Sequence, residues 1–240
     1  MVGYMMSLKK YSKQLYAKLN LIQIFKLWGV PTKLHISFTI AVILLFIYFG
    51  TLGFIQFIYQ TIMIMILMFC LISHEYGHAL AAKRYDITTH DIVITPVGGV
   101  ARIVNLFANP KQEIVIAIAG PLVNIVYFCI GMLLYAFEIP YVHYFVYYFC
   151  LINIIMGVFN LIPAYPMDGG RVLRAILTYV TKDKIISHKI SIMISQFISV
   201  CFIILGFMYN LINVIIIAVL LLVLAQAEKH DKTIYRIKKL

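Results

Sequence analysis

Six long apolar runs dominate the chain, and short polar or turn-rich segments separate them. We place these runs at roughly 34–53, 55–81, 113–137, 141–162, 186–208 and 211–227. Apolar helices of this kind are the elements that cross about 30 Å of hydrocarbon. The pattern therefore predicts an all-α polytopic membrane protein with about six transmembrane helices. The first run follows some thirty residues and lacks an obvious cleavage site, so it does not resemble a signal peptide.

Composition supports the same conclusion without any reference to periodicity. Hydrophobic residues make up 63% of the chain and charged residues only 12%, and the mean hydropathy is +0.96. A soluble domain of 240 residues needs more polar surface than these charges supply. We therefore expect the lipid bilayer to be the surroundings of this protein.

The positions of the basic residues predict an orientation. In the six-span interpretation all twenty Lys and Arg residues fall on one side, in the segments Lys9–Lys33, Lys83–Lys111, Arg171–Lys189 and Lys229–Lys239. Lys and Arg collect on cytoplasmic flanks, so both termini are expected to be cytoplasmic. The domains would be a basic N-terminal segment 1–33, a six-span membrane domain 34–227 and a basic tail 228–240.

The net charge of +11 has a competing interpretation as nucleic-acid binding, but no basic stripe with interleaved aromatic residues lies outside the membrane flanks. We expect no nucleic-acid partner. The first thirty residues are also consistent with an amphipathic surface helix whose Leu15, Leu19, Ile22, Ile24 and Phe25 face the membrane. A docking segment for a partner is the alternative.

A second kind of pattern lies between the second and third apolar runs. Residues Asp91 to Val104 form two β-branched runs around Gly98-Gly99, which is typical of a hairpin. Unpaired strand edges are not tolerated in lipid unless they line a protein cavity. A re-entrant hairpin near the active site and an ordinary surface hairpin are equally compatible with the sequence.

The second apolar run ends in His74-Glu75-Tyr76-Gly77-His78. Histidines four residues apart lie on the same face of a helix, so both imidazoles can reach one metal ion, with Glu75 beside them as a candidate base. Ionisable groups inside a membrane are costly and are functional by default. The motif predicts a hydrolytic zinc site close to the cytoplasmic end of this span.

A catalytic zinc ion needs a third protein ligand, and Asp168 is the candidate that this chain offers. It follows Pro163 and Pro166, which cannot continue a helix, and it precedes Gly169-Gly170, so it is presented on a broken segment at the same membrane boundary. Its alternative role is to cap a helix that begins near Arg171. We favour ligation.

Four motifs in this order resemble the site-2 protease family of intramembrane zinc metalloproteases, in particular its small bacterial and archaeal members related to the protease that processes a sporulation pro-sigma factor. The resemblance covers residues 34 to 227. The motifs are His74-Glu75-x-x-His78, Pro96-x-Gly98-Gly99, Gly120-Pro121-x-x-Asn124 and Asn160-x-x-Pro163-x-x-Pro166-x-Asp168-Gly169.

This resemblance implies that His74, His78 and Asp168 hold one Zn²⁺, that Glu75 is catalytic, and that the substrate is a transmembrane protein. Asn124 and Asn160 are polar groups in apolar spans, so they either support the site or its oxyanion, or bond between helices. An inhibitory or regulatory membrane protein is a possible further partner. We expect no PDZ domain and no CBS domain in the chain.

Two alternatives use the same residues differently. A membrane metal transporter would use His74, His78 and Asp168 as a permeation site, although its ligands would be expected along a path across the bilayer. A zinc protease of another family would take its third ligand from Glu113, Glu138 or Glu228. His90 and Asp91 are rival ligands by residue type, expected in a solvated loop, and His35 is expected to be an interfacial residue.

Overall fold

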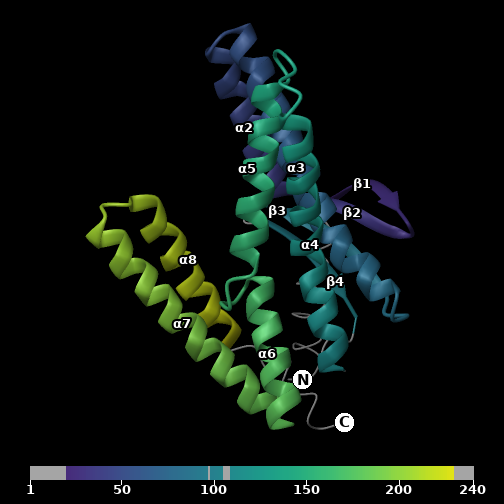
Figure 1. Ribbon diagram of the computed structural model, residues 1–240, viewed down its shortest axis with the longest axis vertical. Coiled ribbons are helices and arrows are strands. Elements are labelled where there is room, and N and C mark those ends of the chain that lie inside the picture. Colours follow the sequence, from purple (N-terminus) through teal and green to yellow (C-terminus); the bar gives the residue numbers. More distant parts are fainter. Residues whose placement is uncertain (1–19, 97, 105–108, 230–240) are drawn as a thin grey trace, which may run out of the picture.

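The computed structural model describes residues 20–96, 98–104 and 109–229. Its elements form a mostly helical protein with one small sheet (Figure 1). In chain order they are β1 (Leu21–Leu27), β2 (Val30–His35), α2 (Ile36–Thr51), α3 (Phe54–Lys83), β3 (Thr89–Thr95), β4 (Gly98–Ile103), α4 (Pro110–Tyr135), α5 (His143–Asn160), α6 (Asp168–Thr181), α7 (Lys184–Met208) and α8 (Ile212–Lys229).

Within the described residues, four helices are long and apolar enough to cross a membrane, judged by length and composition: α3, α4, α5 and α7. The helices α2 and α8 are apolar but shorter. Large apolar side chains such as Phe54, Met65 and Phe69 of α3 are exposed, as expected where lipid is the solvent. The protein is therefore an integral membrane protein, and the count of six spans stays a prediction.

The sheet has four strands in the order β1-β2-β3-β4. The hairpin expected between Asp91 and Val104 is present, because β3 pairs antiparallel with β4. The strand β2 joins β3 in parallel through the long connection of α2 and α3, and β1 pairs antiparallel with β2. The expectation of an all-α protein with a single hairpin is therefore wrong in one respect, the size of the sheet.

The second correction concerns the N-terminal segment. Residues Leu21–Leu27 form β1 rather than an amphipathic helix, so Ile22, Ile24 and Phe25 lie on a strand. A turn at Trp28 and Gly29, both with positive φ, reverses the chain into β2. Leu15 and Leu19 lie outside the described residues. The strand β1 is held by its pairing with β2 across this turn, and apolar spacing alone did not distinguish a strand from a surface helix there.

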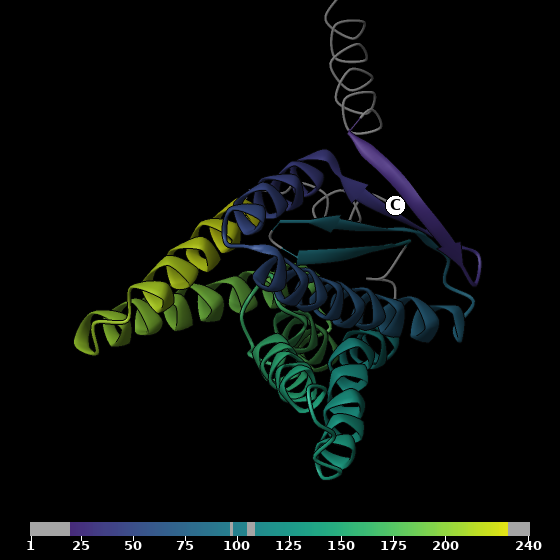
Figure 2. The ribbon, with the colours of Figure 1, turned by 90° about the horizontal axis from the view of Figure 1, so that it is seen from above.

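Helix α3 lies between the sheet and the helices α4 and α5 (Figure 2). Tyr76 and Ala79 pack on Ile92 and Ile94 of β3, and the Tyr76 hydroxyl lies 2.9 Å from Oγ1 of Thr32 on β2. Successive helix residues are 100° apart, so Tyr76 faces the sheet while the histidines two positions before and after it face α4. The buried residues of α3 all lie in its second half.

Candidate metal centre

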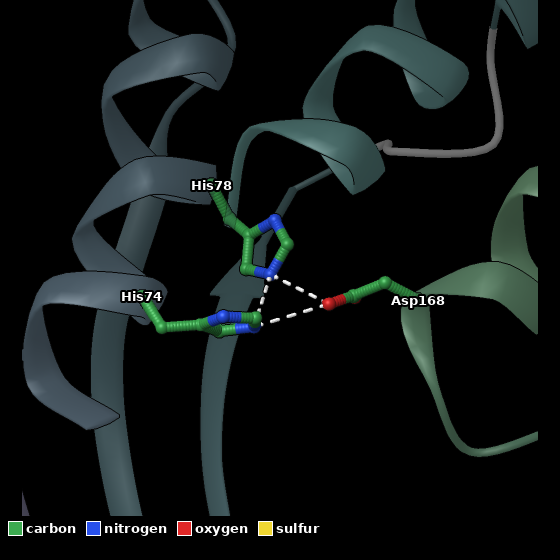
Figure 3. Close-up of side chains that lie close together, drawn as sticks. All are labelled: His74, His78 and Asp168. Atoms are coloured by element: carbon green, nitrogen blue, oxygen red, sulfur yellow. Dashed lines mark hydrogen bonds and ion pairs between the residues drawn. The ribbon is translucent and has the colours of Figure 1, made fainter. Parts of the chain in front are cut away.

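His74 and His78 of α3 meet Asp168 of α6 in a buried cluster (Figure 3). The Nε2 atoms of the two histidines are 3.1 Å apart, and each lies 3.1 Å from Oδ2 of Asp168. All three residues are buried. The structure thus brings together, across 94 residues of chain, the three side chains that the sequence predicts as ligands.

A hydrogen bond at the far side of the His78 ring determines which nitrogen carries the proton. Nδ1 of His78 lies 2.7 Å from the backbone carbonyl oxygen of Ile116. Because a carbonyl oxygen can only accept, His78 donates from Nδ1, and in the neutral ring Nε2 keeps its lone pair. That lone pair points into the cluster.

A chain of hydrogen-bonded amides determines in the same way which ring nitrogen of His74 carries the proton. Nδ2 of Asn153 donates to the carbonyl oxygen of Phe149 at 2.8 Å, so Oδ1 of Asn153 accepts from Nδ2 of Asn124 at 2.9 Å. Asn124 then presents Oδ1 to Nδ1 of His74 at 2.5 Å. His74 therefore donates from Nδ1, and its Nε2 lone pair also faces the cluster.

The cluster fits a bound cation. Two imidazole lone pairs and one carboxylate oxygen converge with no donor between them, which is repulsive unless a metal ion or an additional proton occupies the centre. Ligand atoms about 2.0–2.1 Å from a tetrahedral zinc ion are about 3.3 Å apart, close to the observed 3.1 Å. Two imidazoles and a carboxylate are also a donor set that suits zinc.

Small residues make room for this arrangement. A side chain on Gly120 of α4 would overlap the Nε2 atoms of both histidines, and one on Gly77 would overlap the backbone of α4. A side chain on Gly169 would overlap the carbonyl oxygens of Leu161 and Ile162. These glycines of the sequence motifs therefore permit α3, α4 and the start of α6 to converge on one point.

The position of Asp168 excludes the capping role. It is the first residue of α6, the N-cap is Met167, and the Asp168 carboxylate turns to the histidines. Arg171 lies one turn later, with Nη1 3.4 Å from Oδ1 of Asp168. Oδ1 of Asp168 thus interacts with the Arg171 guanidinium, whereas Oδ2 faces the two histidines.

Glu75 lies beside the cluster and contacts the sheet. Its Oε2 accepts a hydrogen bond of 2.8 Å from the backbone N–H of Ala101 on β4. A side chain on Gly99 of the same strand would overlap the Glu75 carboxylate. The hairpin predicted from the sequence therefore lies against the candidate base, and Gly99 is the residue that permits the close approach.

Rival ligands lie elsewhere. The Asp91 side chain is fully buried on β3, not in a solvated loop as expected, while the His90 side chain is exposed. Asp91 Oδ2 lies 2.6 Å from Nζ of Lys33, and Arg102 bonds both carboxylate oxygens. Burial by itself raises the pKa of Asp91, but the hydrogen bonds from Arg102 and Lys33 outweigh it and lower this pKa to about 2. Asp91 joins strands rather than binding metal.

The alternative glutamates and histidine also have other surroundings. Glu113 forms a buried ion pair with Arg174 that joins α4 to α6. Glu138 lies in the exposed turn after α4, and Glu228 lies near Tyr165. His35 caps α2, where its Nδ1 accepts from the N–H of Ser37. None of these four belongs to the described metal cluster.

The two asparagines named from the sequence differ in their contacts. Asn124 contacts His74, whereas Nδ2 of Asn160 donates 2.9 Å to the carbonyl oxygen of Met156 in its own helix. Asn153, the buried amide that orients Asn124, was not predicted from the sequence. A signal was present, because Asn153 is a polar residue within an apolar span and such residues need partners.

This fold and this site define the class of protein: a membrane protein with a buried metal centre between its helices. The family model described as Peptidase family M50 matches residues 62–140 and 136–206. The chain belongs to this family, the site-2 proteases. The family match gives no support to the metal transporter considered from the sequence.

Individual relatives support the same family assignment. A zinc metalloprotease of Methanocaldococcus jannaschii is 35% identical over 219 residues, which cover 89% of this chain and 61% of that protein. Stage IV sporulation protein FB of Bacillus subtilis is 31% identical over 45% of this chain and 37% of its own length. The solved structure of a site-2 protease from Methanocaldococcus jannaschii superposes with a TM-score of 0.67 at 31% identity, covering 88% of this chain and 96% of that one. The chain thus spans less than two thirds of the length of these two curated relatives.

Proposed function

We propose that this protein is a zinc metalloprotease that hydrolyses a peptide bond within or near a transmembrane segment of a membrane-protein substrate. One observation carries the proposal. The Nε2 lone pairs of His74 and His78 face Oδ2 of Asp168 at 3.1 Å, with Glu75 beside them. Membership of the site-2 protease family and the name of the Methanocaldococcus relative support it.

Each residue has a separate role in this proposal. His74, His78 and Asp168 hold the ion, and Asn124 with Asn153 keeps His74 in the tautomer that can bind. When bound, zinc lowers the pKa of a water molecule and polarises the scissile carbonyl.

Glu75 accepts the proton of the attacking water and passes it to the leaving amine as the peptide bond breaks. The Ala101 N–H holds one Glu75 oxygen, which leaves the other free to move the proton.

The sheet suggests how a substrate is presented. The strand β4 lies at one end of the strand order and directly against Glu75. An extended peptide can add to a strand edge through backbone hydrogen bonds, whereas a helical peptide hides its amides. We infer that the substrate unwinds locally and lies extended beside β4.

The proposed orientation has both termini and the metal centre towards the cytoplasmic face. Support comes from the basic residues at one end of the helices: Lys111 at the start of α4 and Lys182 at the end of α6 both lie over the Tyr179 ring. The domain division 1–33, 34–227 and 228–240 belongs to this proposal. A cytoplasmic site favours release of a cytoplasmic fragment, and control by a further membrane protein remains a prediction from the resemblance.

The test measures bound zinc and cleavage of a model membrane substrate for the unmodified protein and for Glu75→Gln. The variant should retain one equivalent of zinc, because Glu75 is not a ligand, and should lose about 10²–10⁴-fold in rate, the usual contribution of a general base. Glu138→Gln, in the exposed turn after α4, is the matched control. Cleavage that survives Glu75→Gln, or the absence of zinc from the unmodified protein, would refute the proposal.

A further inference from the structure

Tyr165 connects the segment before Asp168 to the last two helices. Its backbone N–H donates to Oγ of Ser195 in α7 at 2.8 Å. Its side chain reaches α8, where burial and the nearby Glu228 carboxylate raise the pKa of Tyr165 to about 12. One residue, three positions before the proposed ligand, therefore contacts both α7 and α8.

The helices α7 and α8 form a pair. They pack on each other, and α7 contacts the rest of the described protein mainly through α6. Figure 1 shows the pair leaning away from α3, α4 and α5. Displacement of this pair relative to α3 would thus pull on Tyr165 as well as on α6.

The segment from Tyr165 to Asp168 is packed too closely on α6 for Tyr165 to move independently of Asp168. A side chain on Gly170 would overlap the backbone of Ala164 and Tyr165, so the segment packs directly on the first turn of α6. That turn begins with Asp168. A shift of Tyr165 is therefore expected to change the distance between Asp168 and the two histidines.

We propose that Ser195 and Tyr165 are positioning residues that couple the α7–α8 pair to the Asp168 carboxylate. Displacement of the pair weakens the metal centre, and a bound ion in turn restrains the pair, because coupling between two sites is reciprocal. The inference rests on the proposed zinc ligation by Asp168. It adds that ligand geometry depends on helices that contribute no ligand.

Ser195 differs from its neighbours in α7 in the way this role needs. Buried serines recur every four residues, and the hydroxyls of Ser191 and Ser199 bond only to carbonyl oxygens of their own helix in the hydrogen bonds described. The Ser195 hydroxyl also donates to its own helix, but it accepts from Tyr165 as well. Ser199→Ala is therefore a matched control, since it removes an equally buried hydroxyl without touching Tyr165.

The first experiment follows release of zinc into excess chelator from the full-length protein in detergent. Ser195→Ala should accelerate release by about tenfold, because the Tyr165 N–H loses its buried acceptor. Ser195→Thr, which restores a hydroxyl, should return the rate to within about twofold, and Ser199→Ala should not change it. The visible spectrum of bound Co²⁺ should change in Ser195→Ala alone, since only there is the ligand geometry altered.

A second variant keeps the test informative if Ser195→Ala does not fold. Tyr165→Phe retains the ring and the backbone N–H but loses the hydroxyl near Glu228, and it should accelerate release by about two- to threefold. Equal release rates from Ser195→Ala, Ser199→Ala and the unmodified protein, or an unchanged rate in Tyr165→Phe when Ser195→Ala is unfolded, would overturn the inference.

The reciprocal effect can be measured with native cysteines. Cys129 of α4 is exposed and Cys201 of α7 is half-buried, while Cys70 and Cys150 are buried, so spin labels on the first two report the α4–α7 distance. Zinc removal should broaden that distance distribution in the unmodified protein and leave Ser195→Ala unchanged. An equal response in both proteins, or none in the unmodified protein, contradicts the coupling. An unmodified protein that binds no zinc instead refutes the proposed function.

Discussion

The side-chain oxygen of Asn124 lies 2.5 Å from Nδ1 of His74, and this contact decides which ring nitrogen is free. The amide of Asn153 fixes Asn124 in turn. The proposed centre is therefore prepared by side chains of α4 and α5 that do not touch the ion. Loss of such a partner typically lowers metal affinity or activity about 10- to 100-fold.

We expect Asn124→Ala to weaken zinc binding by about 10- to 100-fold, because His74 loses the acceptor that sets its tautomer and its orientation. Competition with a chelator of known affinity measures the effect. Asn160→Ala is the comparison, since Asn160 bonds within its own helix, and it should bind zinc as tightly as the unmodified protein. Equal affinities in the two variants would contradict a role for Asn124.

Removal of the Asp168 carboxylate should reduce zinc binding more than the loss of Asn124 does. Asp168→Ala leaves two histidine lone pairs and no anionic ligand, so we expect substoichiometric zinc and no detectable cleavage. Metal analysis after purification measures the loss, and Asp86→Asn, in an exposed turn, serves as the control. One equivalent of zinc with normal cleavage in Asp168→Ala would exclude ligation by this residue.

Because of the ion pairs of Asp91, we expect the stability of the fold to depend on pH. The pKa of Asp91 falls from 3.8 in the unfolded chain to about 2 in the fold. A depressed pKa stabilises the fold fully above the unfolded value, and this stabilisation is lost as the pH falls towards 2. Asp91→Asn should therefore lower the thermal unfolding midpoint in detergent at pH 6, and the difference from the unmodified protein should shrink between pH 4 and pH 2. A difference that is constant over this range would contradict the assignment.

The proposed orientation is tested at three positions. Cysteine at Glu138, in the turn after α4, should react with a membrane-impermeant thiol reagent added to intact cells. Cysteine at Asp86, in the turn after α3, should react only after lysis, because it lies beside Lys83 and Arg84 on the basic side. A reporter fused after Leu240 should be cytoplasmic. The opposite pattern would reverse the topology.

Local features of the sequence predicted the elements whose causes are local. Apolar runs correspond to the helices α2 to α5, α7 and α8, and the β-branched segment from Asp91 to Val104 corresponds to the β3–β4 hairpin. The strand β1 pairs locally with β2, but its apolar residues were also compatible with a surface helix, and β2 was missed because it pairs in parallel with β3 across two intervening helices. Pairing of that kind leaves no periodic signal in the nearby sequence.

The candidate site also has a part that local sequence predicts and a part that depends on tertiary contacts. The four-residue spacing of His74 and His78 is enough to place both imidazoles on one helix face, because helix geometry does not depend on the rest of the fold. The sequence alone therefore determined the pair of proposed ligands, the glutamate beside them and their setting in an apolar segment. Asp168 was proposed as the third ligand from the proline-rich break before it.

Only the tertiary structure decided how these parts meet. The convergence of Asp168 on the histidines, the Asn153–Asn124–His74 chain and the bond from Tyr165 to Ser195 join residues between 29 and 94 positions apart. Contacts at that separation depend on how close two helices approach, which glycines such as Gly77 and Gly120 permit. No spacing rule along one helix contains that information, because packing between elements is set by their whole contacting surfaces.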